Sequence, residues 1–78
     1  MSDPKLELLK TIIKSNEDLT PRIKVDDIVL KSKFAEDMGF DSMAMMSLIY
    51  ELQDKYPALD ETEAIEMRSV EKLLTILK

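Results

Sequence analysis

A serine that follows a glycine-containing turn is the residue of this sequence best placed to do chemistry. Residues 38–42 read Met-Gly-Phe-Asp-Ser and lead into a run of strong helix formers that ends at Pro57. Gly39 is the only glycine in the 78 residues, and a single glycine is favoured where the backbone turns tightly or takes a positive φ. Asp41 and Ser42 are both typical of helix N-termini. The order predicts a sharp turn that presents Ser42 at the start of a helix.

This position favours chemistry on a phosphate. The first backbone N–H groups of a helix lack partners within the helix, and together with the helix dipole they stabilise a nearby negative charge. A serine hydroxyl held there is a good acceptor for a phosphate-linked group. The simpler interpretation is that Asp41 or Ser42 only caps the helix, and for an isolated Asp-Ser pair the cap preference is a sufficient explanation.

The composition excludes catalysis by the chain's own thiol or imidazole groups. The chain has no cysteine and no histidine, so it offers no thiol nucleophile, disulfide, histidine base or histidine metal ligand. A chain of 78 residues allows one small domain, which we expect to span residues 1–78. We expect a protein that is not an enzyme and holds no metal. Any thiol chemistry must use the thiol of a cofactor.

The acidic charge is concentrated in the middle of the chain. The net charge is −5, and residues 34–66 contain nine acids against one base, which gives this segment a charge of −8. Such a surface repels nucleic acid and attracts basic protein partners, although the acids could also simply solvate a helical surface. The sequence has neither an apolar run of about 18 residues nor a signal-peptide pattern. We therefore expect no membrane span and a cytoplasmic location.

The spacing of apolar residues predicts an all-α protein. Apolar residues recur at i, i+3, i+4 and i+7, and no segment alternates as a strand does. The expected helices are a first one capped by Ser2 or Asp3 and ending near Ser15, a second from Ser42 to Tyr56, a short third one from Asp60 or Thr62 through Glu66, and a fourth capped by Ser69. They predict a small up-and-down four-helix bundle with three main helices and one short helix. The short third helix is expected to bury Ala64 and either Ile65 or Met67.

A long connection, residues 16–33, separates the first two helices. Its apolar content is too high for a free linker, so we expect it to lie across the bundle and to insert side chains into the core. The residues expected to insert are Ile23, Val25, Ile28, Val29 and Leu30. Within this connection, residues 25–29 are expected to form a short helical turn.

The expected second helix carries two apolar stripes. The stripe that should face the core comprises Met45, Leu48, Ile49, Leu52 and Tyr56. The second stripe begins beside Ser42 and comprises Met43, Met46 and Tyr50. A surface helix needs only one apolar stripe, so the second is a candidate partner-binding surface. The simpler interpretation is that Met43 and Met46 pack under the long loop.

The block from Phe34 to Met43 resembles the prosthetic-group site of acyl carrier proteins. Both have an aromatic or aliphatic residue, an acidic stretch, an apolar residue before glycine, and then Asp-Ser followed by an apolar residue. The resemblance extends over nearly the full chain, because the long first loop and the stretch from Ala64 to Val70 also match. It implies that Ser42 bears 4'-phosphopantetheine, which a phosphopantetheinyl transferase attaches from coenzyme A. It also implies that Asp41 helps the transferase at this step.

The resemblance further implies a monomeric carrier with no activity of its own. Acyl groups would be held as thioesters and presented in turn to the acyl-transferring and synthase enzymes of fatty acid, polyketide or related lipid biosynthesis. The expected partner-binding residues are Met43, Met46, Tyr50 and Asp54. General fatty-acid carriers place acids early in the second helix, whereas here no acid precedes Glu51 on that helix. The pattern therefore indicates a specialised member rather than the housekeeping carrier.

Two other functions stay open. Asp-Ser-Met in place of Asp-Ser-Leu is also the pattern of D-alanyl carrier proteins, which would make this an aminoacyl carrier. An unmodified helical adaptor that binds a basic or apolar helix in a groove is the alternative from a different class. A calcium site is disfavoured, because Asp37 and Asp41 lack the other ligands and the closing glutamate of an EF-hand loop.

Overall fold

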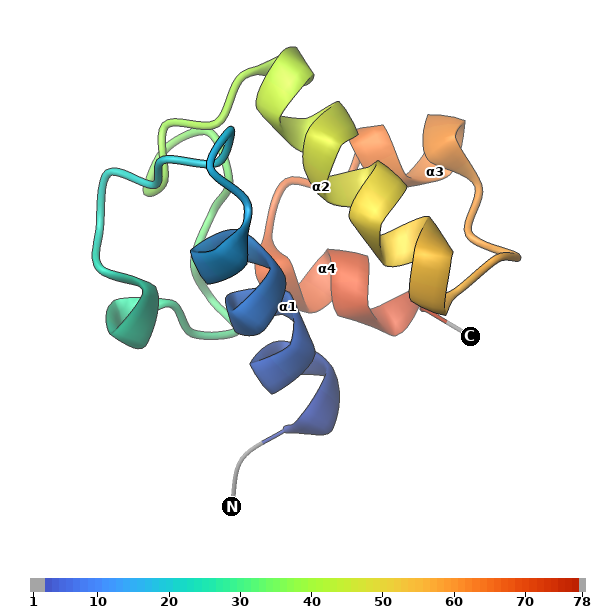
Figure 1. Cartoon of the computed structure of the whole chain (residues 1–78), viewed down its shortest axis with the longest axis horizontal. Helices are drawn as coiled ribbons and strands as arrows, with labels where there is room; N and C mark the ends of the chain where they lie inside the picture. The colour runs from blue at the N-terminus through green and yellow to red at the C-terminus, as the bar shows by residue number, and fades with distance from the viewer. Residues whose placement is uncertain (1–2, 78) are drawn as a thin grey trace.

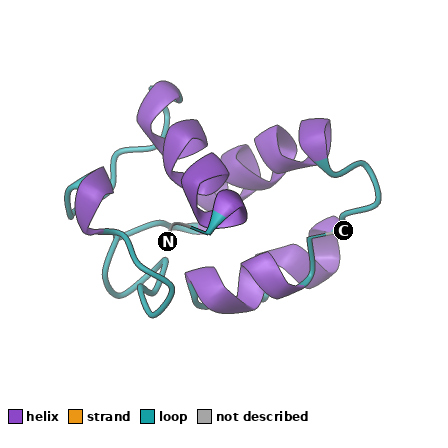
Figure 2. Ribbon diagram, turned by 90° about the horizontal axis from the view of Figure 1, so that it is seen from below, coloured by secondary structure: helices purple, strands orange, loops and turns teal. Residues whose placement is uncertain are grey.

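The computed structural model describes residues 3–77 as helices joined by loops (Figure 1). The elements are α1 (Pro4–Ser15), the 3-10 turn η1 (Val25–Asp27), α2 (Ser42–Lys55), α3 (Glu61–Ile65) and α4 (Val70–Thr75). Within these residues there is helix and loop but no β-strand (Figure 2). None of the described helices combines the length and apolarity that a membrane span requires. The prediction of a small all-α bundle with a long first loop is confirmed.

The predicted starts of the helices are confirmed by their caps. Asp3 caps α1, because its Oδ1 accepts a hydrogen bond of 2.9 Å from Lys5 N; Ser2, the other candidate, lies outside the described residues. Asp60 caps α3 and Ser69 caps α4 in the same way. Each cap satisfies backbone N–H groups that have no partner within the helix, so a short polar residue fixes where the helix begins.

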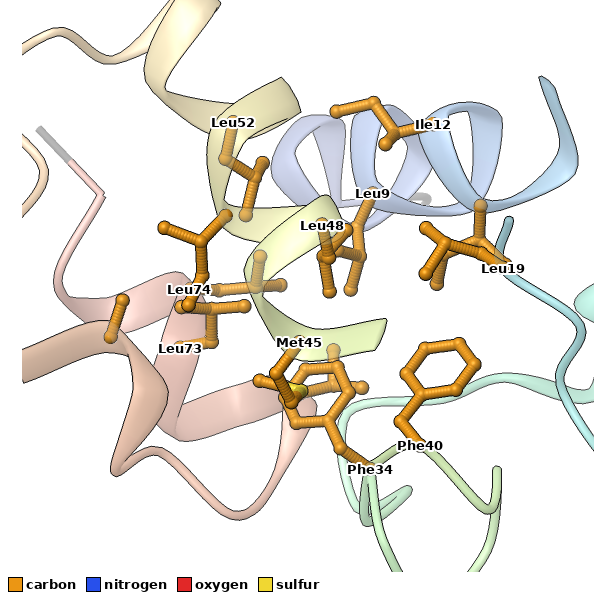
Figure 3. Packing of buried hydrophobic residues seen from close by; sticks show 14 of the residues in the cluster. Leu9, Ile12, Leu19, Phe34, Phe40, Met45, Leu48, Leu52, Leu73 and Leu74 are labelled. Atoms are coloured by element: carbon orange, nitrogen blue, oxygen red, sulfur yellow. The ribbon is translucent and has the colours of Figure 1, made fainter. Parts of the chain in front are cut away.

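The core lies between α2 and the other helices, and α2 supplies its centre. Leu48, Ile49 and Leu52 are completely buried and Met45 is 6% exposed, as the predicted stripe requires. Figure 3 shows Leu48 and Leu52 of α2 between the side chains of α1 and those of α4. Tyr56, the fifth expected residue, is the C-cap of a helix that ends one residue earlier than predicted. It is therefore only half-buried, at the edge of the core.

The long loop inserts apolar side chains into the core, as predicted, with one exception. Ile28 is buried, while Ile23, Val25 and Leu30 are partly buried against the core. Val29 is 53% exposed, so its predicted insertion is wrong. Its N–H donates to the buried hydroxyl of Ser32 (2.9 Å) and Ser32 N donates to its carbonyl (3.0 Å), which makes a tight turn with Val29 on the outside.

The end of the loop is tied to the start of α4 by backbone hydrogen bonds. Phe34 N donates to Arg68 O (3.0 Å) and Val70 N donates to Ser32 O (2.9 Å). Between them, Lys33 and Ser69 form an isolated antiparallel bridge. Residues 32–34 therefore lie beside residues 68–70, although no strand-like alternation marks either segment.

The short third helix buries fewer residues than its neighbours. Ala64 is completely buried, as predicted. Of the two alternatives for its second core residue, Met67 is partly buried against the core and Ile65 is 37% exposed. The side of α3 that carries Ile65 is therefore available to line a surface groove.

The acidic charge of residues 34–66 is expected to weaken the native state at low salt. All nine acids are exposed, and the only ion pairs among residues 3–77 are Lys10–Glu7 at 3.9 Å and Lys33–Glu36 at 3.4 Å. Most of the repulsion is therefore uncompensated, and salt screens it over a Debye length of about 10 Å at 0.1 M. The melting temperature should rise when moderate salt or a millimolar divalent cation is added. A melting temperature that is flat or falls with salt would contradict this expectation.

Candidate functional site

The turn before α2 requires its glycine because of the backbone conformation at this position. Gly39 has a φ of +73°, and no other described residue has a positive φ. A Cβ at this position would also lie 2.8 Å from Nη2 of Arg22. The backbone N–H of Arg22 donates to Met38 O at 2.8 Å, which brings this residue of the long loop beside the turn, while its guanidinium ends an exposed side chain that can move aside. The predicted tight turn is confirmed, and the glycine also makes room for an arginine, which the sequence did not indicate.

The turn is anchored in the core by two phenylalanines. Phe40 N donates to Phe34 O at 2.9 Å, and this bond closes the loop between the two residues. Their rings stack at 6.3 Å between centroids with an interplanar angle of 14°. Figure 3 shows both rings below the first turn of α2, beside Met45. Because Phe40 immediately precedes Asp41 and Ser42, the buried ring fixes where α2 begins.

Asp41 is the cap of α2. Its Oδ1 accepts from Ala44 N at 2.8 Å and its carbonyl accepts from Met45 N at 2.9 Å. The two N–H groups between them, those of Ser42 and Met43, find no acceptor among residues 3–77. They point from the N-terminus of a 14-residue helix, where the dipole favours an anion. Ser42 is exposed at the first position of this helix.

A groove with a volume of about 290 Å³ opens beside Ser42. One side is formed by the segment that leads into α2, and the other by the end of α3 and the connection to α4. Its apolar lining consists of Phe34, Ala35, Phe40, Met45, Ile65 and Met67. Its charged lining consists of Lys33, Glu36, Asp41 and Arg68. Sequence reasoning missed Lys33 and Arg68, since only the tertiary bridge between their segments brings them to one groove.

The second apolar stripe of α2 is only partly on the surface. Met43 is 79% exposed and Tyr50 is 55% exposed, so neither packs under the long loop. Met46 is half-buried and packs against the core, which corrects its assignment to an exposed surface. Asp54 is exposed near the other end of α2. Within residues 3–77 no group of three acids comes together in a way that could hold a metal ion.

Comparison with known families finds one match over nearly the whole chain. A family model described as "Phosphopantetheine attachment site" matches residues 7–77, a range that includes the turn, Ser42 and both walls of the groove. No curated protein and no solved structure matched the chain. Domains of this family are carriers with covalently attached 4'-phosphopantetheine and are not catalytic units.

Proposed function

Because the chain belongs to the phosphopantetheine attachment-site family, we propose that Ser42 is the residue that bears the 4'-phosphopantetheine. The observation that carries this proposal is the exposure of Ser42 at the first position of α2. The other serines of residues 3–77 are placed differently. Ser32 is buried, Ser69 caps α4, Ser47 lies in the middle of α2 and Ser15 ends α1.

The attachment step needs a hydroxyl, coenzyme A and a transferase. The Ser42 oxygen forms a bond to the phosphorus that carries the pantetheine half of coenzyme A. The bond from this phosphorus to the bridging oxygen breaks, and the adenosine bisphosphate half leaves. The hydroxyl proton passes to a base of the transferase. When bound, the group supplies a thiol that holds acyl groups as thioesters.

The residues around Ser42 fit a covalently held phosphate. The N–H groups of Ser42 and Met43 lack acceptors among the described residues, and they lie at the positive end of the helix dipole. Asp41 uses Oδ1 for the cap, while its Oδ2 accepts no hydrogen bond within residues 3–77. This oxygen is therefore available to the transferase and its metal during the attachment step. The groove beside Ser42 can receive part of the arm.

We propose that this single-domain, monomeric carrier serves a specialised branch of fatty acid, polyketide or related lipid biosynthesis. Its partners would be the transferase and the acyl-transferring and synthase enzymes that dock on α2. The exposure of Met43 and Tyr50 supports an apolar docking surface. Asp54 and Asp41 would set the orientation of the partner through charge.

The experiment that tests the proposed function is a mass measurement. The chain is co-expressed with a broad-range phosphopantetheinyl transferase, and the intact mass is then determined. We expect the mass to increase by one phosphopantetheinyl group. A chain that stays unmodified under conditions that modify an established carrier would favour the adaptor alternative.

The docking surface leads to a prediction about turnover by a general fatty-acid ketosynthase. The first turns of α2 lack acids, so the loaded chain should be a poor substrate, and Ala44→Asp with Ser47→Glu should improve it. Added acids steer a basic partner, and a gain in kcat/KM of roughly 3- to 10-fold is expected at low salt. The matched control, Thr11→Asp with Ser15→Glu, adds the same charge to exposed positions of α1. Efficient turnover of the unchanged chain would remove the basis of a specialised docking surface.

A further inference from the structure

The groove beside Ser42 combines an apolar lining with two cations. Phe34, Met45 and Met67 contribute apolar surface, while Lys33 and Arg68 bring positive charge. Both cations lie just outside the acidic segment, residues 34–66, whose charge is −8. The groove therefore contains two positive side chains next to a segment whose net charge is strongly negative.

Backbone hydrogen bonds bring the two residues that carry these cations close together. Lys33 belongs to the bridge with Ser69, and the carbonyl of Arg68 accepts from Phe34 N at 3.0 Å. Residues 33 and 68 therefore belong to two segments that are hydrogen-bonded to each other. Because the Arg68 contact uses only backbone atoms and its side chain is exposed, its guanidinium remains available to a ligand.

The four charges of the groove do not compensate each other equally. Glu36 lies 3.4 Å from Lys33, and both side chains are more than half exposed, so this pair is weak. Asp41 is engaged as the cap of α2. Arg68 has no ion-pair partner among residues 3–77. With two cations and two acids the lining has no net charge, but Arg68 is the charged residue of the groove that is neither ion-paired nor engaged as a cap among residues 3–77. Its guanidinium offers a planar, bidentate donor suited to a carboxylate or phosphate.

The phosphate of the arm would have hydrogen-bond donors of its own beside Ser42. That phosphate would be bonded to the Ser42 oxygen, where the N–H groups of Ser42 and Met43 lack acceptors among the described residues. Arg68 belongs to the other wall, formed by residues 65–68. An anion at the far end of the arm would reach the cation on that wall when the arm folds back over the apolar lining.

We propose that the cargo of this carrier is a short acyl group with a free carboxylate, and that Arg68, assisted by Lys33, binds this carboxylate in the groove. The proposal rests on Ser42 as the attachment site. The groove volume of about 290 Å³ lies at the lower end of the range for small-molecule sites, which fits a short group better than a long chain. A dicarboxylic acid joined to the thiol through one end is the matching chemical class.

The test compares two cargoes of equal length on the same chain. The transferase loads Ser42 from the coenzyme A thioester of succinic acid, labelled with ¹³C at the free carboxylate, or from that of butyric acid. Intact mass confirms loading, and NMR then gives the pKa of the labelled carboxylate. At low salt we expect this pKa to be higher in Arg68→Gln than in the unchanged chain by about half a unit, since an exposed cation stabilises a nearby carboxylate weakly. The Arg68 side-chain signal should move with succinyl and not with butyryl.

Two matched variants separate a specific contact from general electrostatics. Lys72→Gln removes the same charge from an exposed position on α4 outside the groove, and should leave the pKa nearly unchanged. Arg68→Lys keeps the charge and should retain most of the effect. Equal pKa values in the unchanged chain and in Arg68→Gln, or an equal effect of Lys72→Gln, would overturn the proposal. An Arg68 signal that moves fully on attachment of the arm without cargo would do the same, because the phosphate would then be the ligand. Failure to load Ser42 is seen earlier, by mass, and overturns the proposed function itself.

Discussion

Replacement of Ser42 by alanine is expected to abolish phosphopantetheine attachment completely and to leave the fold intact. The substitution removes the oxygen that forms the bond to phosphorus. The cap of α2 is kept, because it is Asp41 Oδ1 that accepts from Ala44 N at 2.8 Å. Alanine is a strong helix former and the position is exposed, so the free energy of unfolding should change by no more than about 0.5 kcal/mol. Intact mass after incubation with coenzyme A and the transferase measures the loading.

The control for this variant is Ser47→Ala on the same helix. Ser47 lies in the middle of α2 and is half-buried, so its replacement should leave loading unchanged. Thermal unfolding of both variants separates a lost attachment site from a lost fold. Full loading of the Ser42→Ala chain would move the attachment to another hydroxyl and refute the assignment.

The helix starts and the turn could be predicted because they are decided by neighbouring residues. Asp41 caps α2 through a contact only three residues along the chain. Gly39 takes the positive φ that a single glycine just before a helix start indicates. The central core residues of α2, such as Leu48 and Leu52, follow from helical periodicity alone.

The interior of the long loop could not be predicted in detail because its contacts are not periodic. Leu19 of this loop is buried, although no helical period marks its position. The hydrophobicity of Val29 predicts a buried side chain. The turn closed by Ser32 instead places this side chain on the surface. Hydrophobicity indicates that such a segment packs, whereas the hydrogen bonds of its turns decide which side chains enter the core.

The surfaces near Ser42 could likewise be predicted only in part from the sequence. Met43, Met46 and Tyr50 share one stripe of an ideal helix, yet Met46 lies next to the core stripe and packs against it. The charged lining of the groove depends on the backbone bridge between Lys33 and Ser69. No local sequence pattern predicts this bridge. The attachment residue could thus be predicted from local sequence, while the shape and charge of its surroundings required the tertiary structure.

Replacement of Phe40 by alanine is expected to cause the largest loss of stability at the site. Phe40 is 5% exposed and its ring stacks on Phe34 at 6.3 Å. Truncation of a buried phenylalanine costs about 3–5 kcal/mol, because the cavity that it leaves is only partly closed. A small domain has a free energy of unfolding near the lower end of about 5–15 kcal/mol. Chemical denaturation should therefore show that this variant loses most of its stability, with Phe40→Leu as a milder variant that stays folded.

The same substitution is expected to extend the groove into the core. Phe40 lines the groove as well as the core, so its removal joins the new cavity to the space beside Ser42. An apolar cavity of this kind is filled favourably by an apolar ligand. A longer acyl chain on Ser42 should therefore restore part of the lost stability. Octanoyl should raise the melting temperature above that of the butyryl form more in Phe40→Ala and Phe40→Leu than in the unchanged chain, by several degrees for each kcal/mol regained.

The control for this effect is a cavity that does not meet the groove. Leu74 of α4 is 5% exposed and does not line the groove, so Leu74→Ala should lose about 2–5 kcal/mol without a larger gain from octanoyl. An equal gain in Leu74→Ala and the Phe40 variants would mean that the chain stabilises any loosened core. It would then contradict the inference that Phe40 separates the groove from the interior. A gain confined to the Phe40 variants would identify this ring as the residue that limits the length of the acyl group the groove can hold.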